Sequence, residues 1–338
     1  MIKRLAALLL AIAAQPAWAQ DAPAGTPVAC HGALAVRDGQ IVDQHGAPVT
    51  LRGMSLFWSQ WAPQYFSAET VAWLARDWQV DVVRAAIAAE GNDSARQHFE
   101  REFAKASAVI DAAVANGIYV VVDWHAHRAH PDEAERFLTA IATKYGHLPN
   151  LIYEDWNEPL RDGVEWSRDV KPYHLRVLGA VRAIDPDNLM IAGSPSWSQD
   201  VDLAAQDPLP FTNLAYTLHY YAGTHRQELR DKADAARDKG LALLVTEFGV
   251  VDADGDGPIA LAESERWWAW DEAHRIGWMA WSIGDRDESS AALRPGTPAA
   301  HWTEADLTES GKLLRDRLRR AADEGRNPAC HGSTTNIR

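Results

Sequence analysis

Two glutamates stand in sequence patterns that could perform chemistry. Glu158 lies between Asn157 and Pro159, Glu247 follows Thr246, and each comes after a short apolar run. When two carboxyl groups are held about 5–5.5 Å apart, one can protonate the leaving oxygen of a glycosidic bond while the other attacks the anomeric carbon. The pair therefore predicts glycoside hydrolysis with retention of configuration. A lone strand-end glutamate is more often a surface charge, but two of them among aromatic residues favour a shared site.

Three further side chains have the chemistry to assist these carboxylates. The cation of Arg84 would lower the pKa of Glu247 and keep it ionised, as a nucleophile must be. Tyr221 could donate a hydrogen bond to the same carboxylate. Asn157 could hydrogen-bond a sugar 2-hydroxyl, a contact that strengthens in the transition state. We expect the charge on Glu247 to raise the pKa of Glu158, so that Glu158 retains the proton it donates.

Eight short runs rich in apolar and β-branched residues are the candidate strands that position these groups. They alternate with amphipathic segments, the pattern of a parallel sheet buried on both faces. The predicted strands cover residues 49–54, 80–85, 118–123, 151–156, 189–192, 214–219, 241–247 and 277–282. The predicted helices cover residues 68–77, 96–116, 132–145, 171–184, 225–239, 260–275 and 310–322, and the fifth connection offers only residues 198–205.

This alternation predicts the α/β class and a (β/α)8 TIM barrel, preceded by a short N-terminal hairpin around Asp38-Gly39. An open doubly wound sheet is the alternative, but no glycine-rich phosphate turn follows any predicted strand. In a TIM barrel the chemistry gathers at the carboxyl ends of the strands. Polar and aromatic residues stand at nearly all of these ends: Arg84, Asp123, Trp124, His125, Asn157, Glu158, Trp197, His219, Tyr221, Glu247 and Trp281.

The ordered series of motifs resembles glycoside hydrolase family 5, and within it the bacterial secreted endo-β-1,4-glucanases. The resemblance runs from about residue 30 to about residue 320. It is carried by residues 51–55, 77–78, 83–86, 118–125, 152–154, 157–159, 197–201, 219–225, 246–249, 281–282 and 287–293.

The resemblance implies that Glu158 is the acid/base and Glu247 the nucleophile. It also implies a substrate-binding set: Arg84, His125, Asn157, His219, Tyr221 and Trp281 around the cleaved sugar, Trp197 as a stacking platform on the leaving-group side, Trp61 as one on the other side, and Glu288. Indole rings suit the role of stacking platform, because the axial C–H groups of a pyranose pack on a flat apolar surface.

Three departures from the family pattern fall outside the catalytic motifs. Phe57 stands where many relatives have histidine, and Asp285-Arg286 replaces a usual His-Lys pair. The loop after the second predicted strand, residues 88–92, lacks the usual tyrosine. We therefore expect the distal sugar subsites to differ from those of relatives while the bond-breaking groups are retained.

Composition excludes several classes of protein. Of 338 residues, 47% are hydrophobic and 24% charged, which is ordinary for a packed globular protein. The formal charge of −14 argues against a nucleic-acid or anionic-membrane partner. Fifteen tryptophans outnumber both tyrosine and phenylalanine, which favours stacking surfaces. Because no linker or repeat interrupts residues 34–322, we expect a single catalytic domain over residues 20–338, a monomer that needs no cofactor.

Residues 1–19 are typical of a secretory signal peptide. Lys3 and Arg4 precede an apolar run over residues 5–14, and Ala17 and Ala19 supply the small residues of a cleavage site. An uncleaved anchor is the alternative, although the run is too short to cross a bilayer. We expect a secreted protein, extracellular or periplasmic.

The chain has two cysteines, Cys30 and Cys330, each followed by His-Gly. In an oxidising compartment a disulfide that joins the two ends is favoured. The alternative is a zinc site that includes His31 and His331, but zinc motifs leave two or more residues between ligands.

Two other patterns resemble metal sites. In the run from His125 to His130, His125 is needed at the strand end and the remaining histidines are expected in a solvated loop. The second pattern matches the spacing of a calcium loop: Asp252, Asp254, Asp256 and Glu263. A strand precedes it where a calcium loop has a helix, and this hydrolysis needs no metal, so we predict none.

We therefore expect a retaining endo-β-1,4-glucanase whose partner is a β-glucan. A retaining endo-hydrolase of mannan, xyloglucan or mixed-linkage β-glucan is the first alternative. A non-catalytic glycan-binding protein is a remote one, because it would require one of the two glutamates to be absent or misplaced.

Overall fold

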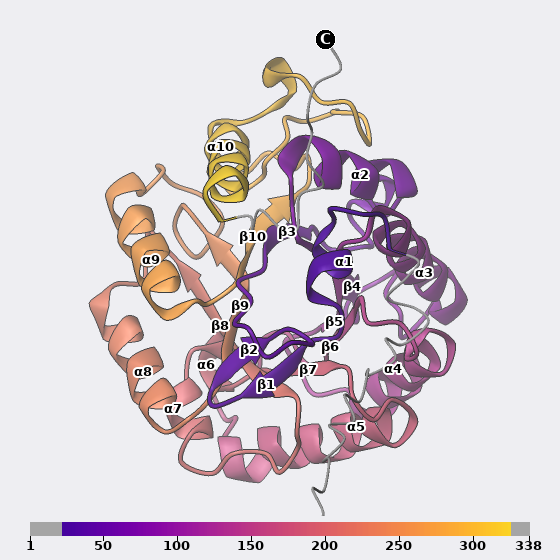
Figure 1. Ribbon diagram of the computed structural model, residues 1–338, viewed down its shortest axis with the longest axis vertical. Helices are drawn as coiled ribbons and strands as arrows, with labels where there is room; N and C mark the ends of the chain where they lie inside the picture. The colour runs from indigo at the N-terminus through magenta and orange to yellow at the C-terminus, as the bar shows by residue number, and fades with distance from the viewer. Residues whose placement is uncertain (1–21, 326–338) are drawn as a thin grey trace, which may run out of the picture.

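The computed structural model describes residues 22–325. Its centre is a closed barrel of eight parallel strands in the order β10-β3-β4-β5-β6-β7-β8-β9, surrounded by helices (Figure 1). The strands are β3 (Arg52–Leu56), β4 (Val82–Ala88), β5 (Tyr119–His125), β6 (Leu151–Glu154), β7 (Leu189–Ala192), β8 (Leu214–Tyr221), β9 (Leu243–Gly249) and β10 (Trp278–Ile283). The predicted (β/α)8 barrel is confirmed, and the strand boundaries differ from the prediction by no more than three residues.

The strand register brings the carboxyl ends to one level. Asp123 pairs with Glu154 across β5 and β6, and His219 pairs with Glu247 across β8 and β9. Apart from Arg52, all residues of these eight strands are buried, because helices cover the outside and side chains fill the inside. Polar side chains at the carboxyl ends are therefore held by a rigid apolar frame.

The helices of the outer layer follow the predicted segments closely. They are α2 (Ala68–Trp73), α3 (Phe99–Asn116), α4 (Pro131–Tyr145), α5 (Lys171–Ile184), α8 (Gln227–Asp238), α9 (Leu261–His274) and α10 (Glu309–Gly325). α2 continues as a π-helical turn over Leu74–Trp78. The weak fifth connection forms only two short helices, α6 (Pro195–Ser198) and α7 (Val201–Ala204).

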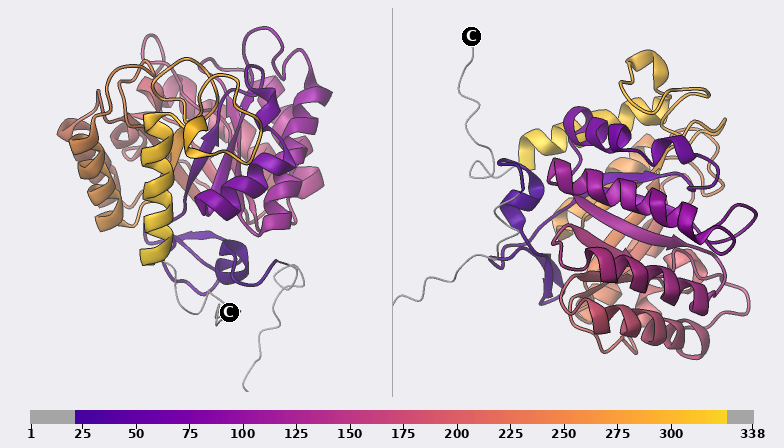
Figure 2. Two further views of the ribbon diagram at one scale, coloured as in Figure 1. Left: turned by 90° about the horizontal axis from the view of Figure 1, so that it is seen from above. Right: turned by 90° about the vertical axis from the view of Figure 1, so that its right-hand side faces the viewer.

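The amino ends of the strands are closed by the N-terminal segment. Helix α1 (Pro27–His31) and the hairpin of β1 (Ala35–Arg37) and β2 (Gln40–Val42) lie over this end of the barrel (Figures 1 and 2). Their apolar side chains form one cluster with the inner residues of the strands. The positive φ angles of Asp38 and Gly39 fit the predicted two-residue turn. Because α1 and the hairpin cover the amino ends of the strands, the carboxyl ends are left open for a functional site.

Several predictions fall on residues 1–21 and 326–338, outside the described part of the chain. The signal peptide of residues 1–19 is one, and the Cys30–Cys330 disulfide is another, since only Cys30, in α1, is described. Among the described helices, none combines the length and apolar composition needed to cross a membrane.

Candidate active site

The two predicted glutamates lie in one cavity of about 220 Å³ at the carboxyl ends of the strands. Glu158 follows β6, and Glu247 lies within β9 on another part of the barrel wall. The cavity is lined by Phe57, Trp58, His125, His127, Asn157, Glu158, Tyr221, Glu247, Ala253, Asp254, Gly255, Trp281 and Glu288.

The carboxyl groups of Glu158 and Glu247 face each other. One oxygen of each, together with a ring nitrogen of His219, lies within 4.8 Å of the other two atoms. His219 Nδ1 is 2.9 Å from Glu158 Oε1, so this histidine holds the Glu158 side chain in place. The two carboxyl groups are therefore close enough for one to protonate and the other to attack, as in retaining hydrolysis, where the groups are about 5–5.5 Å apart.

Arg84 is a fully buried cation surrounded by acidic groups. Its guanidinium donates to Glu247 Oε2 at 2.9 Å and to Glu154 Oε2 at 2.8 Å, and lies 2.9 Å from Asp123 Oδ2. It also donates to Asn157 Oδ1 at 2.6 Å. That bond leaves the amide nitrogen of Asn157 as its free donor, the arrangement needed to bind a sugar hydroxyl.

Tyr221 and Thr246 complete the support of the carboxylates. Tyr221 Oη donates to Glu247 Oε1 at 2.8 Å, the contact expected from the sequence. Thr246 Oγ1 donates to Glu154 Oε1 at 2.7 Å and lies 3.0 Å from His219 Nε2. The Glu247 carboxylate therefore has one partner on each oxygen, which fixes its orientation.

His125 is held between a carboxylate and aromatic rings. Its Nδ1 lies 2.6 Å from Asp123 Oδ2, and its ring stacks on Trp281 with centroids 5.2 Å apart. The edge of its ring meets Trp58. Burial, aided by the nearby Arg84 cation, lowers the pKa of His125 well below its usual value, so the ring is neutral.

Two exposed tryptophans flank the cavity. Trp61 has 52% of its surface exposed and Trp197 has 36%. Exposed indole rings of this kind can serve as stacking platforms for a sugar chain.

The backbone around Trp197 is unusual. Ser196, Trp197 and Ser198 have φ angles of 59°, 56° and 58°, in the left-handed region that non-glycine residues seldom adopt. Ser198 Oγ donates to the carbonyl of Asn157 at 2.7 Å, and the Trp197 amide donates to the carbonyl of Pro159 at 2.9 Å. These bonds fix the tryptophan relative to the loop that carries Glu158.

The departures from the family pattern lie at the rim near Trp61. The Phe57 ring packs against Trp281 and Trp61, with centroid distances of 5.2 and 6.2 Å. Asp285 accepts hydrogen bonds from Gln64 Nε2 and from the Gly296 amide. Phe57 therefore lines the cavity, whereas Asp285 is not among its lining residues.

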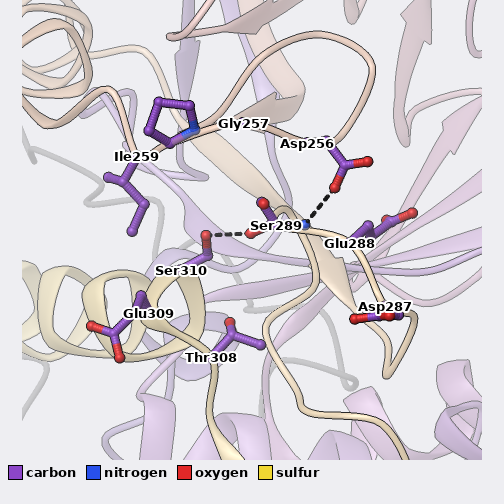
Figure 3. A pocket seen from close by; sticks show the side chains of 10 residues that line it. Asp256, Gly257, Ile259, Asp287, Glu288, Ser289, Thr308, Glu309 and Ser310 are labelled. Atoms are coloured by element: carbon purple, nitrogen blue, oxygen red, sulfur yellow. Dashed lines mark hydrogen bonds between the residues drawn. The ribbon is translucent and has the colours of Figure 1, made fainter.

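A second cavity, of about 570 Å³, adjoins the first at Glu288, which lines both. Figure 3 shows its wall, where the Ser289 amide donates to Asp256 and Ser310 donates to the Ser289 carbonyl. Ser290 Oγ donates to Glu288 Oε1 at 2.9 Å. Burial raises the pKa of Glu288.

The calcium pattern is not assembled as a calcium site. Glu263, which would be its last ligand, forms ion pairs with Arg230 and Arg266 at 2.7 Å each. Within residues 22–325, the only grouping of three or more His, Cys, Asp or Glu side chains close enough to share an ion is Glu158, His219 and Glu247. Glu158 is bonded to His219, and Glu247 to Arg84 and Tyr221, and we interpret these groups as acid–base groups.

The pKa directions expected from the sequence for the two glutamates are wrong. Burial raises the pKa of Glu247 and outweighs the lowering by Arg84, because the carboxylate has lost its water. Burial would raise the pKa of Glu158 too, but hydrogen bonds from His127 and His219 outweigh it and lower the value to about 2. The sequence-based expectation did not include the hydrogen bonds from His127 and His219, which lower the pKa of Glu158.

His127 also corrects the expectation of a solvated loop. Its Nε2 lies 3.3 Å from Glu158 Oε2, and only 34% of its side chain is exposed. Glu90, from the atypical loop after β4, lies on its other side. The sequence places Glu154 only within the motif of residues 152–154, yet the structure shows it as a fully buried partner of Arg84. Its position at the end of a strand and beside the acid/base motif was the available signal.

Comparison with known proteins gives a consistent result. Residues 42–287 match the family described as Cellulase (glycosyl hydrolase family 5). Endoglucanase N of Pectobacterium atrosepticum is 40% identical over 313 residues, which cover 90% of this chain and 69% of that protein. The chain spans 61% to 69% of the length of three curated endoglucanases that it matches.

Solved structures extend the similarity to the fold. A structure from Cytophaga hutchinsonii has a TM-score of 0.86 and 44% identity, and the match covers 88% of this chain and 98% of that one. The catalytic domain of Thermobifida fusca endoglucanase Cel5A, solved in complex with cellotetraose, has a TM-score of 0.81 and 30% identity. That match covers 87% of this chain and 99% of that one.

Proposed function

The chain belongs to the cellulase family, glycosyl hydrolase family 5, and from that premise we propose that it cleaves internal β-1,4-glucosidic bonds with Glu158 as acid/base and Glu247 as nucleophile. It is a glycoside hydrolase, a cellulase whose substrate is a β-glucan. The relatives named above support the endo-acting, β-1,4-specific assignment, because they carry the name endoglucanase.

The separation of the two carboxyl groups is the observation that carries the mechanism. One oxygen of Glu158 lies within 4.8 Å of one oxygen of Glu247, and this short separation supports direct attack by Glu247. An inverting enzyme instead holds its two carboxyl groups farther apart, to leave room for a water molecule. Glu247 attacks the anomeric carbon while Glu158 gives a proton to the leaving oxygen. Glu158 then removes a proton from water, which releases the sugar from Glu247 with its original configuration.

The surrounding residues support these roles. Arg84 and Tyr221 bond the two oxygens of Glu247 and stabilise the negative charge that returns when the glycosyl–enzyme bond breaks. The free amide donor of Asn157 can bind the sugar 2-hydroxyl, while Trp281 offers an apolar floor. Trp61 and Trp197, on either side, fit a chain of several sugars better than a single one.

The remaining expectations from the sequence form part of the proposal. We propose that residues 1–19 direct export, that residues 20–338 act as a single catalytic domain, and that the enzyme works as a monomer without nucleic-acid or membrane partners. The basic n-region, apolar run and small residues near Ala19 support export. The formal charge of −14 argues against anionic partners.

Azide rescue tests the two assignments by stereochemistry. In Glu247→Gly the nucleophile is missing, so azide should attack an activated β-aryl glycoside from the face that Glu247 leaves open and give an α-glycosyl azide of inverted configuration. In Glu158→Ala an activated β-aryl glycoside should still form the covalent intermediate, and azide should release a β-glycosyl azide of retained configuration. Proton NMR of the products reads the configuration. Exchanged outcomes would reverse the roles, and full activity in either variant would place the site elsewhere.

A reducing-end assay tests the substrate. We expect the highest rate on carboxymethylcellulose, compared with glucomannan, xyloglucan and barley β-glucan. The departures at Phe57 and Asp285 lie at the rim that holds distal sugars, so a higher rate on one of the other polymers would change the named substrate and leave the mechanism intact.

A further inference from the structure

Three charged side chains stand in a row at the ends of three successive strands. Glu90 follows β4, His127 follows β5 and Glu158 follows β6. His127 Nδ1 lies 3.6 Å from Glu90 Oε2, and His127 Nε2 lies 3.3 Å from Glu158 Oε2. The imidazole therefore bridges the acid/base carboxylate and a second carboxylate that has no role in the reaction proposed above.

Glu90 is built to remain ionised. The backbone amides of His127 and Arg128 donate to it at 3.3 and 2.8 Å, and His130 Nε2 lies 2.9 Å from its Oε1. Burial would raise the pKa of Glu90, but these three partners and the His127 side chain outweigh it and lower the pKa well below its usual range. A fixed anion on one side of His127 and Glu158 on the other favour the charged imidazolium.

The other groups around His127 leave it as the accessible proton carrier. Its ring packs beside Trp58, with centroids 5.5 Å apart, and near the neutral His125 at 6.5 Å. His219, the second histidine on Glu158, is buried and is held through Nε2 by Thr246, with Glu154 3.8 Å away. His127 is about one-third exposed, so it can exchange a proton with solvent.

We propose that His127, held by Glu90, is a positioning residue that stores the proton used by the acid/base Glu158. The inference rests on the proposed function. Before the first step, the proton on Nε2 of His127 passes to the Glu158 carboxylate and leaves a neutral imidazole. Glu158 gives a proton to the glycosidic oxygen as the carbon–oxygen bond breaks. In the second step Glu158 takes a proton from water, and the proton returns to His127, so the protein regains its starting charge.

The electrostatics of the site agree with this order. Burial disfavours the charged form of His127, but Glu158 and Glu90 outweigh it and raise its pKa to about 10. The same contact lowers the pKa of Glu158. An acid with so low a pKa would be empty of its proton at neutral pH, so its proton has to come from a neighbour.

The pH profile of kcat/KM on a cello-oligosaccharide tests the proposal through its basic limb. In the wild type this limb should report loss of the last proton from the His127–Glu158 pair. In His127→Gln it should move to lower pH, because the imidazolium that holds the shared proton beside Glu158 is gone. Glu90→Gln should move the limb in the same direction by less, because it removes only the charge that holds the proton on His127.

Two controls separate storage of the proton from other effects. An aryl cellobioside with an activated leaving group needs no proton, so its profile in His127→Gln should keep the wild-type basic limb. His147→Gln makes the same substitution at an exposed histidine in the turn after α4 and should leave both profiles unchanged.

The direction in which the basic limb moves in His127→Gln distinguishes storage of the proton from a purely electrostatic effect of His127. If His127 acted only by lowering the pKa of Glu158, its removal would move the basic limb to higher pH, and that result or an unmoved limb would overturn the proposal. Failure of the proposed function would look different: the wild type would not cleave the oligosaccharide, or Glu158→Ala would keep its rate.

Discussion

Arg84 Nη1 lies 2.9 Å from Glu247 Oε2, and both groups are buried at the centre of the barrel. The same guanidinium also meets Glu154 and Asp123. One cation thus pairs with the proposed nucleophile and with two further carboxylates that do not line the cavity. We therefore expect stability and catalysis to depend on the same side chain.

Replacement of Arg84 by methionine should therefore destabilise the fold as well as abolish activity. It leaves three buried carboxylates without their cation, and we expect the free energy of unfolding to fall by about 3–5 kcal/mol in urea denaturation. Arg84→Lys should lose less stability, but its kcat/KM should still fall, because an ammonium group cannot replace a planar guanidinium that bonds several partners. Arg76→Met, at an exposed arginine, is the matched control and should change stability by no more than about 0.5 kcal/mol. A stable Arg84→Met protein would contradict this view of the cluster.

Tyr221→Phe should move the acidic limb of the kcat/KM profile to higher pH. The phenol donates to Glu247 and lowers its pKa, so without it a higher pH is needed to ionise the nucleophile. A hydrogen bond to a charged group of about 1.5–3 kcal/mol corresponds to a shift of about one pH unit or more. Tyr220→Phe is the control, because that hydroxyl bonds Asp271 on the outer side of the strand. An unmoved limb in Tyr221→Phe would show that the bond does not set the ionisation of Glu247.

Trp197→Ala should weaken the binding of long oligosaccharides by about 1–3 kcal/mol, the scale of lost aromatic stacking. Its indole lies outside the bond-breaking centre, so the covalent step on a short activated aryl glycoside should stay within about twofold of wild type. Calorimetry on the oligosaccharide and pre-steady-state kinetics on the aryl glycoside measure the two effects. Equal losses on both substrates would mean that Trp197 mainly supports the Asn157–Pro159 loop, to which its segment is bonded.

The proposed Cys30–Cys330 disulfide predicts an exported protein without titratable thiols. Mass spectrometry of unreduced peptides should recover the two cysteines joined, and replacing both by serine should lower the melting temperature, because the bridge restricts the unfolded chain. Two reactive thiols in the native protein would contradict the proposal.

The order of strands, the position of both glutamates and the family were within reach of the sequence. Apolar β-branched runs and amphipathic segments alternate, and this local pattern restricts the fold to a few parallel α/β architectures. Glu158 and Glu247 could be found because each lies in a short motif at the end of such a run. Arg84 and Tyr221 followed from their positions at the ends of other strands.

The contacts that set the charge of these groups were decided by the tertiary structure. Closure of the barrel brings Glu154 against Arg84 although they are 70 residues apart, and it places Glu90, His127 and Glu158 side by side at the ends of separate strands. A pKa depends on burial and on every charge within a few ångströms, and neither is encoded in the spacing of residues along the chain. The sequence therefore determined which groups are proposed to react, whereas only the folded barrel decided which neighbours lie against them.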